Sequence, residues 1–68
     1  MKTARTNFTG DVEDAADFAD EWSTLLGSPV QWGRNNPVTS SDSWFFEAQV
    51  TQEQIDELDM ESDWIIND

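Results

Sequence analysis

Apolar and acidic positions between Asp11 and Leu26 follow the period of an α-helix. On a helical wheel drawn from Val12, the apolar residues fill one half and the acids gather opposite. The apolar set is Val12, Ala15, Ala16, Phe18, Ala19, Trp22, Leu25 and Leu26. Asp11 suits an N-cap, and Gly27 followed by Pro29 is a stop signal. The pattern predicts an amphipathic helix that starts after Asp11 and stops before Gly27.

Beyond this helix the apolar period becomes two, which is typical of β-strands. Val30 and Trp32 alternate, and residues 44–50 alternate over seven positions. One face of that second segment carries Trp44, Phe46, Ala48 and Val50, and the other carries Phe45, Glu47 and Gln49. The turn-forming run GRNNP at 33–37 and the polar run at 39–43 lie between them. We therefore expect two strands joined by a loop of about ten residues, and a first strand over residues 3–8, where Ala4, Thr6 and Phe8 alternate.

A second helix is indicated by two start signals after Val50. Thr51 and Gln54 have the spacing of a capping box, and Val50 and Ile55 that of a hydrophobic staple. We expect a short helix through Asp59 and a final strand near the end of the chain, with Trp64 and Ile66 on one face. The resulting order β-α-β-β-α-β predicts an α+β fold: one domain over residues 1–68, a small antiparallel sheet with two helices on one face, arranged as in a ferredoxin-like split sheet.

The aromatic residues favour a folded chain over a disordered one. Four tryptophans and four phenylalanines supply apolar surface that a highly charged disordered segment lacks. The predicted core aromatics are Trp22, Trp32, Trp44 and Phe46, because they occupy inward faces. Phe45 points outward, so it is either covered by terminal residues or exposed as an anchor for a partner. Trp64 is open to the same two interpretations.

The charge balance is strongly acidic, with fifteen Asp and Glu against Lys2, Arg5 and Arg34, for a net charge of -12. Direct binding to nucleic acid or to an anionic membrane is therefore disfavoured. Cysteine, histidine and tyrosine are absent, which removes thiolate chemistry, the usual neutral-pH base and the commonest metal ligand. We expect no enzymatic activity and no cofactor. No stretch resembles a signal peptide or a membrane span, so we expect a soluble, cytoplasmic protein.

A calcium site is the strongest metal hypothesis that the acids allow. Asp59, Glu61 and Asp63 repeat the first acidic positions of a calcium-binding loop. However, Trp64 stands where that loop needs glycine, and the chain ends before the bidentate acid. We predict no dedicated metal site, and weak association of cations with the acidic faces remains a third possible function.

Carboxylates three or four residues apart on a helix lie about 5–6 Å apart at Cβ, which is comparable with the spacing of phosphates along DNA. A row of acids can therefore imitate a row of phosphates. The predicted partner-binding face is Glu13, Asp14, Asp17, Asp20 and Glu21, and a second acidic cluster is Glu53, Asp56, Glu57 and Asp59. The alternative is that both sets are ordinary solvated helix faces.

In size, acidity and lack of catalytic side chains, the whole chain resembles small phage-encoded inhibitors that mimic DNA, and among them anti-CRISPR proteins. The resemblance implies a monomer in the cytoplasm of a bacterial host. Its expected partner is a basic DNA-binding protein or CRISPR surveillance complex, whose target-DNA or PAM-reading channel it would occupy. Asp14, Asp17, Asp20 and Glu21 would then stand in for phosphates. The competing hypothesis is a salt-adapted, halophilic domain that serves as a protein-interaction module, because abundant acid and little lysine suit a salty cytoplasm.

Overall fold

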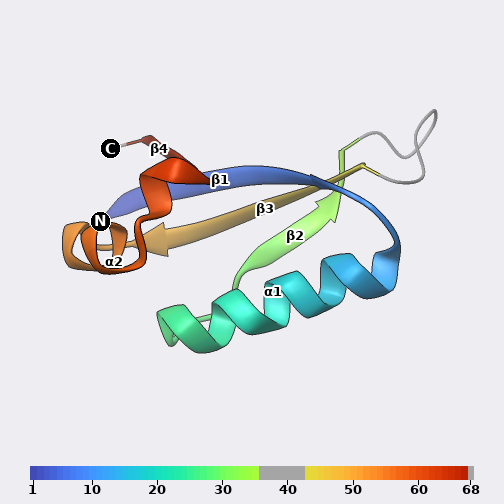
Figure 1. Cartoon of the computed structure of the whole chain (residues 1–68), viewed down its shortest axis with the longest axis horizontal. Coiled ribbons are helices and arrows are strands. Elements are labelled where there is room, and N and C mark those ends of the chain that lie inside the picture. Colours follow the sequence, from blue (N-terminus) through green and yellow to red (C-terminus); the bar gives the residue numbers. More distant parts are fainter. Residues whose placement is uncertain (36–42, 68) are drawn as a thin grey trace.

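The computed structural model describes residues 1–35 and 43–67. It confirms an α+β fold, in which helices pack on a four-stranded antiparallel sheet (Figure 1). The elements in chain order are strand β1 (Lys2–Thr9), helix α1 (Val12–Leu26), strands β2 (Gln31–Arg34) and β3 (Ser43–Val50), helix α2 (Gln52–Leu58), the 3-10 helix η1 (Met60–Ser62) and strand β4 (Ile65–Asn67). Most of the predicted loop between the middle strands, including the end of the GRNNP turn, lies outside the described residues.

The strands are ordered β2-β3-β1-β4, and each neighbouring pair is antiparallel. β1 and β2 therefore run in the same direction, are connected through α1, and have β3 inserted between them. β3 and β4 are related in the same way through α2 and η1, with β1 between them. This is the split β-α-β arrangement that the predicted element order indicated. β1 pairs with β3 from Lys2 opposite Val50 to Thr9 opposite Ser43.

The core lies between one face of the sheet and the two helices. Its buried members are Ala4, Ala15, Ala19, Leu26, Val30, Trp44, Phe46, Ala48, Val50, Ile55, Met60 and Trp64. Alanines on α1 let the helix approach the sheet closely, and Phe18 packs its ring 4.5 Å from that of Phe46. α2 and η1 close one end of the same core through Ile55 and Met60. Each fully buried large side chain contributes about 1.5–3 kcal/mol to folding.

Both helices begin and end close to the predicted positions. Gly27 adopts the left-handed conformation (φ 71°), and its N–H donates to the Ser23 carbonyl oxygen at 2.9 Å. The capping box at the start of α2 is confirmed: Gln54 N–H donates to Thr51 Oγ1, and Thr51 N–H donates to Gln54 Oε1. Asp11 occupies the N-cap position of α1, but its side chain accepts no capping hydrogen bond.

The predicted core aromatics divide into two groups. Trp44 and Phe46 are buried as expected, while Trp22 is half-buried and packs against the core. The prediction that Trp32 belongs to the core is wrong, because 37% of its surface is exposed. Trp32 does lie on the inward face, opposite Phe46, but β2 is the outermost strand, so it has a neighbouring strand on one side only.

The two aromatics with open interpretations are both covered. Phe45 is half-buried on the outer face of the sheet, where the Arg5 guanidinium lies 5.3 Å from its ring centre. Gly33 lies opposite Phe45, and a Cβ added at Gly33 would come within 3.0 Å of that ring. Trp64 is buried in the turn before β4 rather than on a face of the strand, while Ile66 pairs with Ala4 as an inward residue.

Candidate functional site

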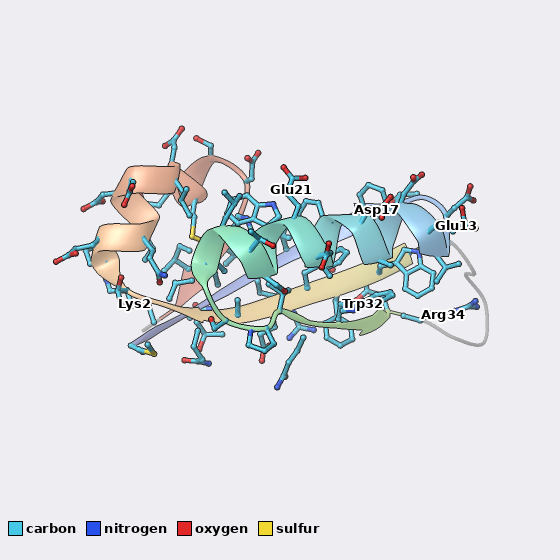
Figure 2. All side chains as sticks on the ribbon, turned by 90° about the horizontal axis from the view of Figure 1, so that it is seen from below. Lys2, Glu13, Asp17, Glu21, Trp32 and Arg34 are labelled. Atoms are coloured by element: carbon cyan, nitrogen blue, oxygen red, sulfur yellow. The ribbon has the colours of Figure 1, made fainter. Side chains whose placement is uncertain are left out.

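The acidic face of α1 is built by the packing of its opposite side. Ala15, Ala19 and Leu26 are buried against the sheet, so residues between them in the sequence turn outward. All five predicted residues of the partner-binding face are exposed: Glu13, Asp14, Asp17, Asp20 and Glu21. Figure 2 shows Glu13, Asp17 and Glu21 spread along the helix from its N-terminal end. The structure therefore brings the predicted acids together on the exposed side of one helix.

No basic residue lies within α1, so none of its carboxylates has a neighbour of opposite charge on the same helix. Two of the three basic residues are engaged elsewhere. Arg5 pairs with Glu47 on the outer face of the sheet at 3.7 Å and covers Phe45. Arg34 places its guanidinium 5.1 Å from the ring centre of Trp44. Within residues 1–35 and 43–67, neither arginine is paired with a carboxylate of α1.

The second acidic cluster lies at the other end of the molecule. Glu53, Asp56 and Glu57 are exposed on α2, and Asp59 ends that helix in a left-handed conformation (φ 51°). Gln54 Nε2 donates to the Leu26 carbonyl oxygen at 3.0 Å, which ties α2 to the C-terminal end of α1. Because the last five residues of α1 (22–26) carry no acid, the two clusters are separated along the helix axis.

A further acidic segment approaches α1 from the side, which sequence spacing did not predict. Trp64, just after η1, packs edge-on against Trp22 with ring centres 5.2 Å apart. This contact holds the segment just after η1 against α1 at Trp22, and Glu61 and Asp63, in and after η1, are exposed. The two tryptophans that make this contact are visible in the sequence, but periodicity does not show that residues about forty positions apart will pack together.

In residues 1–35 and 43–67, no group of three or more acids is arranged to hold a metal ion. Of the calcium-like residues, Asp59 accepts a hydrogen bond from the Ser62 hydroxyl at 2.8 Å and ends α2. This spacing of acids forms a 3-10 turn rather than a loop around a cation. In the same part of the chain, no helix is both long and apolar enough to cross a membrane.

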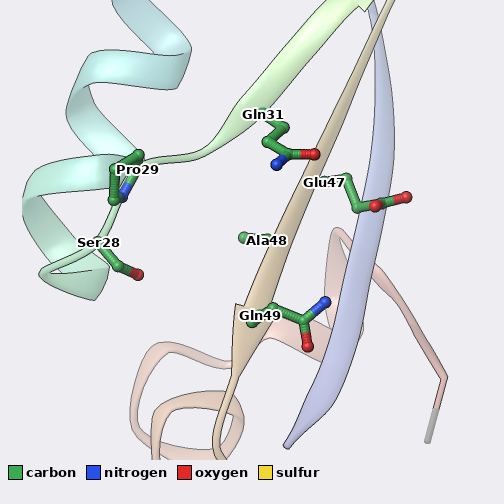
Figure 3. Close-up of a pocket in the computed structure, with 6 residues that line it drawn as sticks. All are labelled: Ser28, Pro29, Gln31, Glu47, Ala48 and Gln49. Atoms are coloured by element: carbon green, nitrogen blue, oxygen red, sulfur yellow. The ribbon is translucent and has the colours of Figure 1, made fainter.

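One shallow hollow lies between the start of β2 and the last residues of β3 (Figure 3). Its lining residues are Ser28, Pro29, Gln31, Glu47, Ala48 and Gln49. The volume of about 190 Å³ is below the roughly 300–1,000 Å³ of typical small-molecule sites. Glu47 turns away from the hollow toward Arg5, so the remaining polar groups are amides and one hydroxyl without a base beside it. This lining offers no nucleophile with an activating partner.

Comparison with known proteins identifies no relative of this chain. No family model matches the chain, and neither a curated protein nor a solved structure matches it.

Proposed function

We propose that the protein is a non-catalytic inhibitor that binds a basic DNA-binding site of a host defence complex by mimicking duplex DNA. Within that class we propose an anti-CRISPR protein that blocks target-DNA or PAM binding. The proposal rests on one observation: the acids of α1 are exposed along one side of the helix, while its opposite side packs on the sheet. Rigid charge costs little ordering entropy when a partner binds.

The spacing on α1 suits a phosphate-binding groove. Asp14, Asp17 and Glu21 form one row at intervals of three and four residues, and Glu13, Asp17 and Asp20 form a second. Neighbours in such rows lie about 5–6 Å apart at Cβ. A Lys/Arg-lined channel would exchange its phosphate contacts for these carboxylates, and electrostatic steering would speed the encounter. The partner would be displaced from DNA in a stoichiometric complex.

The second candidate is a salt-adapted domain that serves as a protein-interaction module. It is favoured by one observation: exposed acids are not confined to α1 but also cover α2 and η1. A solvent adaptation would spread acids over several exposed elements in this way, because it requires no single partner-binding face.

Purified protein added to a panel of CRISPR surveillance complexes and restriction enzymes tests the proposal, with duplex-DNA binding read by gel shift. We expect one panel member to lose DNA binding at a near-stoichiometric ratio. The triple variant Asp14→Asn, Asp17→Asn, Glu21→Gln should weaken inhibition by orders of magnitude. The matched control Glu53→Gln, Asp56→Asn, Glu57→Gln removes the same charge from α2 and should inhibit nearly as well as the wild type.

Two outcomes would contradict the mimicry. If the α1 variant inhibits like the wild type, α1 is not the mimic face. If no panel member is inhibited and the protein folds only in about molar salt, where charges beyond about 3 Å are screened, the acids are an adaptation to solvent.

A further inference from the structure

Trp32 is an exposed indole held in a fixed position. Its ring stacks on Phe46, with an angle of 17° between the planes and centres 6.3 Å apart, and contacts Trp44 at 5.6 Å. Because both supporting rings are buried, the indole has little freedom to move, although 37% of Trp32 is open to solvent. Rigid, partly exposed tryptophans are typical anchors of protein interfaces.

Two other aromatic rings, one on each face of the sheet, already hold arginine side chains. Arg34 lies with its guanidinium carbon 5.1 Å from the centre of the Trp44 ring, and Arg5 lies 5.3 Å from that of Phe45. Both distances fall within the range of a cation–π contact. Aromatic rings on both faces of this sheet thus accept guanidinium groups, and Trp32, which contacts Trp44 on the inward face, is partly open to solvent.

Two contacts fix which border of α1 faces Trp32. Ser23 Oγ accepts a hydrogen bond from the Val30 N–H at 3.0 Å, so the Ser23 border lies toward β2. Phe18 packs on Phe8 and Trp64, which places its border toward β1 and β4. Figure 2 agrees, with Trp32 beside β2 on one side of α1 and Glu21 on the other.

The acids nearest the Trp32 side follow from helical spacing. Asp20 precedes Ser23 by three residues, and Glu13 precedes Asp20 by seven, so both lie on the border toward β2. A partner side chain over Trp32 would therefore meet an aromatic face and carboxylates on the same surface. Arginine fits this combination better than lysine, because its planar guanidinium stacks on rings and pairs with carboxylates in a forked geometry.

We propose that Trp32 is an aromatic anchor that receives an arginine side chain of the basic partner, at the β2 border of the acidic face. The inference rests on the proposed function, because it presumes that the α1 acids meet a basic protein surface. It adds that the surface is recognised by arginine stacking as well as by charge.

Labelled octa-arginine and octa-lysine serve as probes of equal charge, and their dissociation constants are measured by fluorescence anisotropy at about 0.1 M salt. The wild type should prefer octa-arginine. In Trp32→Leu, which keeps an apolar side chain but removes the ring, octa-arginine binding should weaken about two- to fivefold and octa-lysine binding should not change. Leu25→Ala, at an apolar residue that is 49% exposed on the opposite border of α1, is the matched control and should keep the preference.

Equal affinities for both peptides in the wild type, or an unchanged preference in Trp32→Leu, would overturn the anchor. Circular dichroism tests whether each variant is folded. If Trp32→Leu is unfolded, the anchor is tested instead by the peptide preference of the wild type and of Trp32→Phe, which keeps an aromatic ring. Failure of the proposed function is read separately in the gel-shift panel: no DNA-binding complex would be inhibited, while the preference of the wild type for octa-arginine and its loss in Trp32→Leu would stand.

Discussion

Two buried tryptophans differ in how their indole N–H groups are satisfied. Trp44 Nε1 donates to the Gly10 carbonyl oxygen at 2.8 Å, which fastens β3 to the turn before α1. Trp64 is equally buried, but its Nε1 has no hydrogen-bond partner within the part of the chain that the structure describes. Its ring packs against Trp22 and Phe18 instead. A buried donor without a partner costs about 1–3 kcal/mol, which the packing of the Trp64 ring must offset.

Phenylalanine substitutions at these two positions should therefore have unequal costs. Trp44→Phe removes a hydrogen bond and leaves the Gly10 carbonyl unpaired, whereas Trp64→Phe removes a donor that was already unsatisfied. We expect Trp44→Phe to lower the free energy of unfolding by about 1–2 kcal/mol more than Trp64→Phe does. Urea denaturation followed by circular dichroism measures both values. Equal losses would mean that the Trp64 N–H finds a partner, such as water, in solution.

At the scale of elements, the helices were the most predictable part of the fold and the edges of the sheet the least. Periodicity and capping residues predict α1 and α2 well, because the period lies within each helix and the capping residues lie at its ends. Burial at the sheet edge depends on strand order, which brings together residues far apart in the chain. Periodicity therefore predicts Trp32 in the core, although its strand lies at the edge of the sheet. Periodicity also gives no sign of the contact between Trp64 and Trp22.

The candidate site follows the same division. Exposure of the α1 acids could be predicted, since an amphipathic helix must bury its apolar side. Their relation to Trp32 and to η1 could not be predicted, because it depends on which border of the helix faces β2. That orientation is fixed by Ser23 bonding to Val30 and by Phe18 packing on Phe8.

The two helix N-caps give an element-scale prediction. Thr51 accepts a hydrogen bond from Gln54 N–H, while the Asp11 side chain accepts none. Thr51→Ala should lower the free energy of unfolding by about 1 kcal/mol, and Asp11→Ala should change it by less than about 0.5 kcal/mol. Thermal denaturation of the two variants and of Thr51→Ser, which keeps the hydroxyl, measures the difference. A cost at Asp11 equal to that at Thr51 would show that its carboxylate caps α1 in solution.

At the scale of the whole molecule, charge is divided unevenly between two sides. The helical side carries the acids of α1, α2 and η1, all exposed. On the strands of the outer sheet face, the described charged residues are Arg5 and Glu47, which pair with each other. Folding therefore concentrates like charge on one side of a molecule whose largest dimension is 36 Å.

Stability should consequently rise with salt. Between about 0.1 and 1 M sodium chloride, the Debye length falls from about 10 to 3 Å, which is shorter than the spacing of the α1 acids. We expect the melting temperature to increase over this range. The Asp14→Asn, Asp17→Asn, Glu21→Gln variant should melt higher than the wild type at low salt by about 4–8 °C, equivalent to about 1 kcal/mol, and should depend less on salt.

The matched α2 variant should show a similar gain in stability, because repulsion is relieved wherever charge is removed. Together with the gel-shift test, this separates the two effects: stability responds to total charge, and inhibition responds to its place on α1. A melting temperature that does not change with salt would mean that the acids are too far apart or too well hydrated to repel one another.

The strand order also has a consequence for the rate of folding. β1 lies in the middle of the sheet, yet its partners are distant in the chain: Lys2 pairs with Val50, and Thr3 pairs with Asn67. During synthesis β1 emerges before both partners and cannot form its ladders until β3 and β4 follow. Closing such long loops is slow relative to forming local helices, so the domain should fold more slowly than a helical bundle of its length. α1 can form early, but the sheet that holds its acidic face in place is assembled last.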